Sequence, residues 1–363
     1  MNEKDVLIIH PYLKNERVFK DSNLIEAESL TKAIKLKPLI SKAVGLEKIN
    51  SKTYLNSGIV NQTRQSVLNN NIDLVFLNCN LTPIQQRNLE NDINSKIIDR
   101  TGLILEIFGA RAISDEGKLQ VNLASLVYQK SRLVRSWTHL ERQRGGAGFM
   151  GGPGERQIES DRRQLTEKIN RIKKKIKVIS NRRDLQRYRR KKNRLPVVTL
   201  VGYTNSGKST LFNNITKSEI LAKDMLFATL DSTIRKFDIY NNKFVLIDTV
   251  GFIKDLPTNL IAAFKSTLDE ITSSDIILHI RDISNSDSLK QRNDVLAILS
   301  SIGINSDDER IIEVMNKIDL NSNFLNNKKR DTSKNIYISA HKKIGLVQLK
   351  ENIYKKYQTL SQL

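Results

Sequence analysis

The sequence has one cysteine among its 363 residues, Cys79, so no disulfide can form within the chain. It also has no stretch approaching the ~18 uncharged apolar residues that a membrane-spanning helix needs. Near the N-terminus the apolar run is only four residues long and charges flank it on both sides, which does not fit a secretory signal peptide. These absences lead us to expect a cytoplasmic protein without a membrane span.

Acidic residues are few relative to basic ones: 39 Asp and Glu stand against 60 Lys and Arg, for a formal net charge of +21. Such an excess attracts a polyanion, which is RNA, DNA or an anionic membrane. The excess is concentrated, because residues 156–194 contain 17 Lys and Arg but only 4 Asp and Glu. A charge run is ordinarily a solvated helix face, yet here the opposite charges that would neutralise it are missing. The segment therefore predicts a polyanion contact whose affinity falls with salt.

Residues 1–112 alternate short apolar runs with helical patterns, which predicts a small parallel α/β domain. The expected strands are 5–10, 73–78 and 101–108, and the helices between them are expected around 29–36 and 57–71. No catalytic motif or acid–base pair is evident in this domain. Whether it binds a second nucleotide such as ATP is left open by the sequence.

Residues 113–195 predict a long antiparallel helical hairpin with helices at about 116–142 and 155–194. The second helix has an apolar seam with the spacing of a coiled coil, formed by Leu165, Ile169, Ile172, Ile176 and Ile179. The tip, residues 143–155, holds six of the sixteen glycines. Within it, Gly146 to Gly151 matches the dinucleotide fingerprint G-x-G-x-x-G, but that fingerprint follows a strand and this match follows a helix. We interpret the glycines as a slim turn whose backbone can approach RNA closely.

Residues 196–363 alternate strand and helix patterns again and predict a mostly parallel sheet. The motif G-x-x-x-x-G-K-S runs from Gly202 to Ser209, between a predicted strand and a predicted helix. Glycines let its backbone N–H groups wrap around phosphates at a helix N-terminus. Lys208 is expected to reach the β- and γ-phosphates, and Ser209 is expected to ligate Mg²⁺.

The motif "DTVG" follows another apolar strand 46 residues after the start of the phosphate loop. We expect Asp248 to hold Mg²⁺ through a water molecule and Gly251 to offer its N–H to the γ-phosphate. Between the two motifs lies "MLFATLDSTIR", residues 225–235, in which Thr229 and Thr233 are both candidates to close over Mg²⁺.

The motif "NKID", residues 316–319, selects the base. The carboxylate of Asp319 can accept two hydrogen bonds from guanine, whereas adenine would leave it desolvated and unpaired. Asn316 is expected at the other edge of the base and Lys317 over its ring. In "ISAH", residues 338–341, backbone N–H groups near Ser339 and Ala340 are available to the guanine carbonyl.

With these motifs the sequence resembles the HflX family of translational GTPases, and "GGPGERQIESDRR" at 151–163 is the most specific match. The resemblance covers nearly the whole chain. It implies that Thr229 is the threonine that senses Mg²⁺. It further implies binding to the large ribosomal subunit, splitting or rescue of stalled or idle ribosomes in the GTP state, and a hairpin tip that approaches the peptidyl-transferase centre. The alternative function is that of a GTP-regulated RNA-binding factor in ribosome assembly.

Hydrolysis is expected to be slow without outside help. Where Ras-like enzymes place a glutamine that orients water, this chain has Phe252, which cannot form that hydrogen bond. The ribosome is one source of stimulation. A potassium ion bound through Asn205 is another, although a loop-stabilising role for Asn205 is an equal alternative.

The expected site residues form four sets. Lys208, Thr229 and Gly251 are the catalytic candidates, and Ser209, Thr229 and Asp248 are the Mg²⁺ ligands. The nucleotide is expected to contact Gly202, Tyr203, Thr204, Asn205, Ser206, Gly207, Lys208, Ser209, Thr210, Phe227, Ala228, Thr229, Leu230, Asp231, Asp248, Thr249, Val250, Gly251, Asn316, Lys317, Ile318, Asp319, Ser339, Ala340 and His341. RNA is expected to contact Gly151, Gly152, Gly154, Arg156, Arg162 and Arg163 of a monomeric protein.

Overall fold

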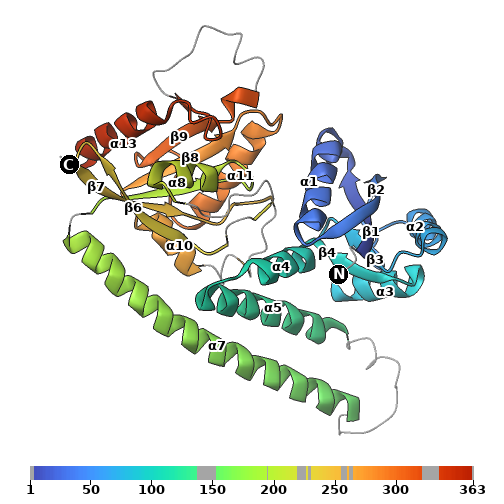
Figure 1. Cartoon of the computed structure of the whole chain (residues 1–363). Coiled ribbons are helices and arrows are strands. Elements are labelled where there is room, and N and C mark those ends of the chain that lie inside the picture. The colour runs from blue at the N-terminus through green and yellow to red at the C-terminus, as the bar shows by residue number, and fades with distance from the viewer. Residues whose placement is uncertain are drawn as a thin grey trace. The chain divides into compact units, whose positions relative to one another are not determined.

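The structure is a computed structural model that describes residues 4–136, 153–193, 195–218, 226–227, 230–254, 260, 265–320 and 335–361. The chain divides into two compact units (Figure 1). The N-terminal unit comprises Met1–Ala110 and Lys118–Ile176, and the C-terminal unit comprises Arg111–Gly117 and Lys177–Leu363. The three-domain division expected from the sequence, with boundaries after residues 112 and 195, stays a prediction.

The N-terminal unit contains a four-stranded parallel sheet in the order β2-β1-β3-β4. Its strands are β1 (Lys4–Leu13), β2 (Leu36–Leu46), β3 (Leu74–Leu77) and β4 (Lys96–Asp99). The connections carry η1 (Lys14–Phe19), α1 (Lys20–Ala33), α2 (Ser57–Asn70) and α3 (Pro83–Ile93). Helical crossovers between parallel strands are the α/β arrangement that the sequence predicts for this region. The strands β2 and β4 and the helix α3 were not among the expected elements.

The expected strand at 101–108 is wrong, because this segment lies in helix α4 (Arg100–Arg111). Its buried residues Leu103, Ile104, Ile107 and Phe108 recur at helical spacing and so form one apolar face. Asp99 initiates the helix, since its carboxylate accepts a hydrogen bond from the N–H of Gly102 at 2.8 Å. An apolar run of this length does not by itself distinguish a buried strand from a buried helix.

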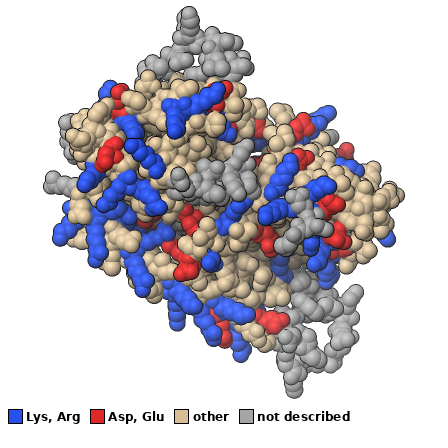
Figure 2. All heavy atoms as spheres, viewed as in Figure 1, with Lys and Arg blue, Asp and Glu red and all other residues tan. Residues whose placement is uncertain are grey.

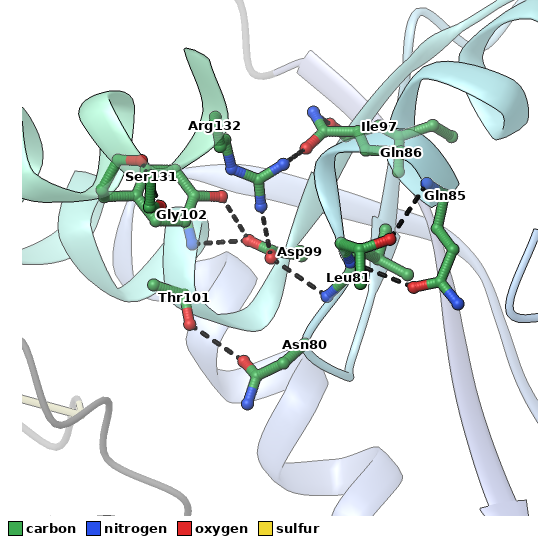
Figure 3. Close-up of polar contacts among 12 residues, drawn as sticks. Asn80, Leu81, Gln85, Gln86, Ile97, Asp99, Thr101, Gly102, Ser131 and Arg132 are labelled. Atoms are coloured by element: carbon green, nitrogen blue, oxygen red, sulfur yellow. Dashed lines mark hydrogen bonds and ion pairs between the residues drawn. The ribbon is translucent and has the colours of Figure 1, made fainter. Parts of the chain in front are cut away.

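Asp99 is also the centre of a buried polar network (Figure 3). Its Oδ2 atom accepts hydrogen bonds from the N–H of Leu81 at 3.2 Å and from Nη2 of Arg132 at 2.7 Å. The hydroxyl of Tyr128 donates to Oδ1 at 2.7 Å, and burial together with the charge of Asp99 raises the pKa of that hydroxyl above its usual range. Because Tyr128 and Arg132 lie on α5, the network ties this helix to the end of β4.

The two long predicted helices are α5 (Asp115–Ser136) and α7 (Pro153–Lys192). In the N-terminal unit they line one surface hollow together with α3, and they run in opposite directions (Figure 1). The expected seam of α7 faces inward: Ile169 and Ile172 are buried, and Leu165, Ile176 and Ile179 are half-buried. Most of the expected tip, including the Gly146–Gly151 match and Trp137 before it, lies outside the described residues.

The C-terminal unit contains a six-stranded sheet in the order β10-β9-β8-β5-β7-β6. Its strands are β5 (Val197–Gly202), β6 (Thr233–Ile239), β7 (Asn242–Asp248), β8 (Ile276–Asp282), β9 (Ile311–Asn316) and β10 (Ile336–Tyr337). Only the β6–β7 pair is antiparallel, and β6 was not expected from the sequence. The helices among the described residues that follow β5 are α8 (Lys208–Thr216), α10 (Lys265–Thr272), α11 (Ser288–Ser301) and α13 (Leu346–Ser361), with η2 at Ile318–Leu320.

This arrangement confirms the predicted fold class, a mostly parallel α/β GTPase sheet preceded by a smaller α/β sheet and long helices. Buried Val198, Leu200, Phe212, Leu278 and Val314 form the core between the sheet and its helices. The carboxyl ends of parallel strands β5, β7, β8 and β9 lie at one edge of the sheet, where open α/β sheets bind ligands. Among the described helices, none has the length and apolar character needed to cross a bilayer.

Candidate nucleotide-binding site

The phosphate loop leaves β5 at Gly202 and enters α8 at Lys208. It is held against the segment that follows β7, because Phe252 N–H donates to the Gly202 carbonyl at 3.0 Å and Thr204 N–H donates to the Phe252 carbonyl at 2.7 Å. Gly207 has a φ of 92°, and a Cβ at this position would overlap the side-chain amide of Asn316. Glycine is therefore required at the point where the helix begins.

Lys208 is buried inside this loop. Its ammonium donates to the carbonyls of Tyr203 at 2.8 Å and Gly202 at 3.1 Å. Burial lowers the pKa of Lys208 to about 8, and the nearby charge of Asp248 opposes the shift. An anion in the loop would favour the charged form of Lys208, which is the electrostatic requirement of a phosphate site.

The expected magnesium ligands Ser209 and Asp248 lie side by side. The hydroxyl of Ser209 donates to Oδ2 of Asp248 at 2.7 Å, and Asp248 is fully buried at the end of β7. Two hard oxygen ligands fit Mg²⁺, which binds few protein groups and keeps waters and phosphate oxygens as its other ligands. Within the described part of the chain, no cluster of three or more His, Cys, Asp or Glu residues could hold a metal by itself.

Gly251 lies close to both the phosphate loop and its lysine. A Cβ at this position would lie 3.1 Å from Nζ of Lys208 and 2.9 Å from Cα of Thr204. Thr249 is buried and its hydroxyl donates to the Leu200 carbonyl at 2.7 Å, so it braces the strand instead of facing the loop. Phe252 is buried as well, and its ring offers no hydrogen bond to a water molecule.

The base-recognition motif follows β9. Asn316 is buried; its amide donates to the Ser206 carbonyl at 2.8 Å and accepts from the Ala340 N–H at 2.9 Å. Lys317 forms an ion pair with Asp282 at 2.8 Å. Although burial acts to raise the pKa of Asp319, a hydrogen bond from Ser339 and the charge of Lys342 hold it below its usual value. The carboxylate of Asp319 is therefore ionised at neutral pH and ready to accept hydrogen bonds.

Two backbone donors of the "ISAH" loop, the N–H groups of Ser339 and Ala340, form hydrogen bonds within the protein. Ser339 N–H donates to the Ile344 carbonyl at 3.1 Å, and Ala340 N–H donates to Asn316. Guanine would have to share or exchange these hydrogen bonds. His341 is exposed beside them.

Part of the segment 225–235 is described. Phe227 and Leu230 are buried, whereas Ala228 and Thr229 lie outside the described residues. Thr233, the other candidate threonine, begins β6 and pairs in register with Asp248. Asp231 is held by backbone N–H groups of Ile113 and Ser114.

The remaining predicted nucleotide contacts are Asn205, Thr210, Val250 and Ile318. Asn205 is exposed with a φ of 59°, Thr210 and Val250 are half-buried, and Ile318 is buried in η2.

The predicted RNA contacts are only partly described. Gly151 and Gly152 lie outside the described residues, Gly154 and Arg156 belong to the first turn of α7, and Arg162 and Arg163 are exposed.

Two residues of this site were missed by sequence reasoning. The side chain of Asn214 in α8 donates to the Ala340 carbonyl at 2.6 Å, and Asp282 holds Lys317. Asp282 ends strand β8 at the ligand-binding edge of the sheet, so its position was a usable signal. Asn214 belongs to none of the recognised motifs, so its contact with the base-recognition loop is seen only in the folded structure.

Comparison with known families gives three matches along the chain. Residues 21–109 match the model "GTP-binding GTPase N-terminal", and residues 111–190 match "GTP-binding GTPase Middle Region". Residues 197–317 match "50S ribosome-binding GTPase". In fold, the chain is similar to the crystal structure of SsGBP in complex with GDP, with 25% identity, a TM-score of 0.53 and coverage of 99% of both chains.

Individual relatives agree with these matches. The chain is 51% identical over 280 residues to GTPase HflX of Magnetococcus marinus, covering 77% of this chain but 64% of that protein. It is 39% identical over 353 residues to GTPase HflX of Escherichia coli, covering 95% of this chain and 81% of that protein. From the matched regions and these identities, we conclude that the chain belongs to the HflX family of GTPases.

Proposed function

We propose that this chain binds and hydrolyses GTP and uses the GTP state to associate with the large ribosomal subunit and to separate or rescue stalled or idle ribosomes in the cytoplasm. The observation that carries the RNA part of the proposal is the charge distribution on α7. The description "50S ribosome-binding GTPase" of the family model that matches residues 197–317 supports the choice of ribosomal RNA.

Two groups of basic side chains on α7 differ in their partners. Arg183 pairs with Glu116 at 2.7 Å, Arg190 pairs with the buried Glu270 at 2.7 Å, and Arg187 approaches Glu270 at 4.0 Å. These three side chains attach the end of α7 to the C-terminal unit, and this role explains their charge without RNA.

The second group faces solvent. Arg182 and Arg189 are exposed, as are the lysines Lys173, Lys174, Lys175 and Lys177. Within the described part of the chain, none of the six has a carboxylate at ion-pair distance. Lys and Arg side chains gather along this part of the surface (Figure 2). Because no carboxylate of the described residues neutralises these charges, phosphate groups of RNA are their best-fitting partner.

In the nucleotide site, the loop from Gly202 to Ser209 would wrap the phosphates, and Lys208 would neutralise their charge. Bound Mg²⁺, held by Ser209, by Asp248 through water and by Thr229, would stabilise the charge that develops during phosphoryl transfer. Asp319 would select guanine. No polar side chain stands in the position of Phe252 to orient water, so the intrinsic rate should be slow, with stimulation by the ribosome and, through Asn205, by K⁺.

The proposal is tested by sedimentation of whole ribosomes through a sucrose gradient. Adding the protein with a non-hydrolysable GTP analogue should convert ribosomes into free subunits, whereas GDP, or the variant Lys208→Ala with the analogue, should not. If ribosomes stay intact and depletion of the protein instead leads to an accumulation of subunit precursors, the role is in assembly.

A further inference from the structure

Asp231 connects the switch segment to the N-terminal cap of helix α5. Its Oδ2 atom accepts hydrogen bonds from the N–H groups of Ile113 at 2.9 Å and Ser114 at 2.8 Å, and the hydroxyl of Ser114 donates to Oδ1. These residues are 117 to 118 positions apart in the sequence and belong to the same compact unit. No predicted nucleotide contact other than Asp231 takes part in these bonds.

The first turn of α5 is built to receive this carboxylate. Ser114 caps the helix, because its hydroxyl accepts a hydrogen bond from the N–H of Gly117 at 2.9 Å. The N–H groups of the cap residue and of Ile113 before it donate to Asp231, and the positive end of the helix dipole favours a negative charge there. A Cβ at Gly117 would overlap Oδ1 of Asp231, so only glycine leaves room for the carboxylate.

The next residue of the switch segment is held by a second helix. The hydroxyl of Ser232 lies 3.4 Å from Nη1 of Arg183 on α7, and the same arginine pairs at 2.7 Å with Glu116 in the first turn of α5. Two consecutive residues, Asp231 and Ser232, are therefore attached to the helices on either side of the predicted RNA-binding tip.

We propose that Asp231 is a positioning residue for the GTP state: it fixes the end of the switch segment to the N-terminal cap of α5, two residues after Thr229. The inference rests on the proposed role of Thr229 at Mg²⁺. Because coupling between two sites is reciprocal, GTP favours the capped α5, and any partner that holds α5 in its capped form favours GTP over GDP.

The test compares the affinities of full-length variants for GDP and for a non-hydrolysable GTP analogue in Mg²⁺. Gly117→Ala is the primary test, because it displaces the carboxylate and Gly117 is not itself a predicted nucleotide contact. Asp231→Ala removes the carboxylate. Each single substitution should lower the affinity for the analogue about tenfold, the scale of lost charge-assisted hydrogen bonds, and Gly117→Ala should change the affinity for GDP by less than about twofold.

The double variant tests whether the two substitutions act through the same contact. Once Asp231→Ala has removed the carboxylate, the methyl group of Gly117→Ala meets only the hydroxyl of Ser114, at 3.1 Å. The double variant should therefore bind the analogue about as tightly as Asp231→Ala alone. Gly109→Ala in α4 is the matched control, because a Cβ there meets nothing within 4 Å. Asp231→Asn keeps an oxygen for the two N–H groups and should lose only part of the effect.

Equal losses for GDP and the analogue would overturn the inference, since they would mean that Asp231 only stabilises the fold. Full additivity of the two substitutions would also overturn it. If Asp231→Ala does not fold, the test uses Asp231→Asn and Gly117→Ala instead. The quantity compared is again the loss of affinity for the analogue relative to the loss of affinity for GDP. Failure of the unmodified protein to bind either nucleotide would instead refute the proposed function.

Discussion

Asn316 donates a hydrogen bond from its side-chain amide to the carbonyl of Ser206 at 2.8 Å, and this bond joins the base-recognition loop to the phosphate loop. The same side chain accepts the N–H of Ala340 at 2.9 Å, so three loops meet at one buried residue. A site connected in this way presents its base and phosphate contacts in a fixed relative position. Preorganisation of this kind reduces the ordering cost of binding a nucleotide.

Gly207→Ala should abolish measurable nucleotide binding. The added methyl group would overlap the amide of Asn316, and alanine disfavours the φ of 92° at this position. Gly303→Ala is the matched control, because Gly303 has a φ of 87° but open space around its Cβ position, and it should cost only about 1–2 kcal/mol of stability. Titration with fluorescent GDP measures both variants. Equal affinities in the two would contradict the contact between the loops.

Asp319→Asn should change which base is bound. The carboxylate of Asp319 is ionised and can accept two guanine donors, while the asparagine amide donates where guanine also donates. We expect a loss of GDP affinity of at least about a hundredfold and a gain for xanthosine diphosphate, whose ring has a carbonyl at position 2. Competition titrations with the two nucleotides measure the switch. Unchanged GDP affinity would place the base elsewhere.

GDP affinity should fall as the pH rises through about 8. Burial lowers the pKa of Lys208 from 10.5 to about 8, so above this pH the free protein has a neutral Lys208. A bound diphosphate favours the charged ammonium, so binding above pH 8 takes up a proton, and each further pH unit weakens binding by up to about tenfold. As the pH falls toward 7, the contribution of Lys208 to this pH dependence should disappear.

The control for this pH dependence is Lys208→Ala. It should bind GDP weakly, and any pH dependence that it retains comes from the nucleotide or from other groups. If GDP affinity changes with pH between 7 and 9 in the same way for the wild type and for Lys208→Ala, Lys208 does not titrate in this range.

Glu270→Ala should be strongly destabilising. The carboxylate of Glu270 is 1% exposed and pairs with Arg190 at 2.7 Å, so its removal leaves a largely buried arginine without its anion, at a cost of about 3–5 kcal/mol. The control is Glu167→Ala, which breaks an exposed pair with Arg171 at 3.8 Å and should cost at most about 1 kcal/mol. Chemical denaturation measures both. Comparable small losses would mean that α7 is attached by other contacts.

Substituting Arg182 and Arg189 by alanine should weaken RNA binding without loss of stability. Both side chains are exposed on α7, and neither has an ion pair within the described part of the chain. Removing two phosphate contacts should reduce the slope of log affinity against log salt by about 1.4 to 1.8. Filter binding to ribosomal RNA at several salt concentrations measures the slope. A slope equal to that of the wild type would remove this face of α7 from the RNA-binding surface.

The sequence indicates a candidate nucleotide site because each motif there has a local physical cause. Asp248 and Asn316 end strands β7 and β9, and the loop that carries Gly207 and Lys208 follows strand β5. The topology of a parallel sheet brings the carboxyl ends of these strands together. Strand β5 was also recognisable from its sequence VVTLVG, because strands buried on both faces are nearly continuous in apolar residues.

Other features depend on contacts that no local pattern specifies. Residues 101–108 are apolar enough for a buried strand, and only the cap by Asp99 and the packing of one face identify them as a helix. Strand β6 alternates in burial beside β7 and has no motif of its own. The bond between Asp231 and Ser114 joins residues 117 positions apart, which a single sequence does not indicate.

The central claim, that GTP controls association with the large ribosomal subunit, is tested most directly by co-sedimentation of the protein with purified large and small subunits. The account predicts binding to the large subunit that is at least about tenfold tighter with a non-hydrolysable GTP analogue than with GDP, a difference of about 1.4 kcal/mol. It also predicts no comparable binding to the small subunit. Equal affinity for the large subunit in both nucleotide states, or preferential binding to the small subunit, would contradict it.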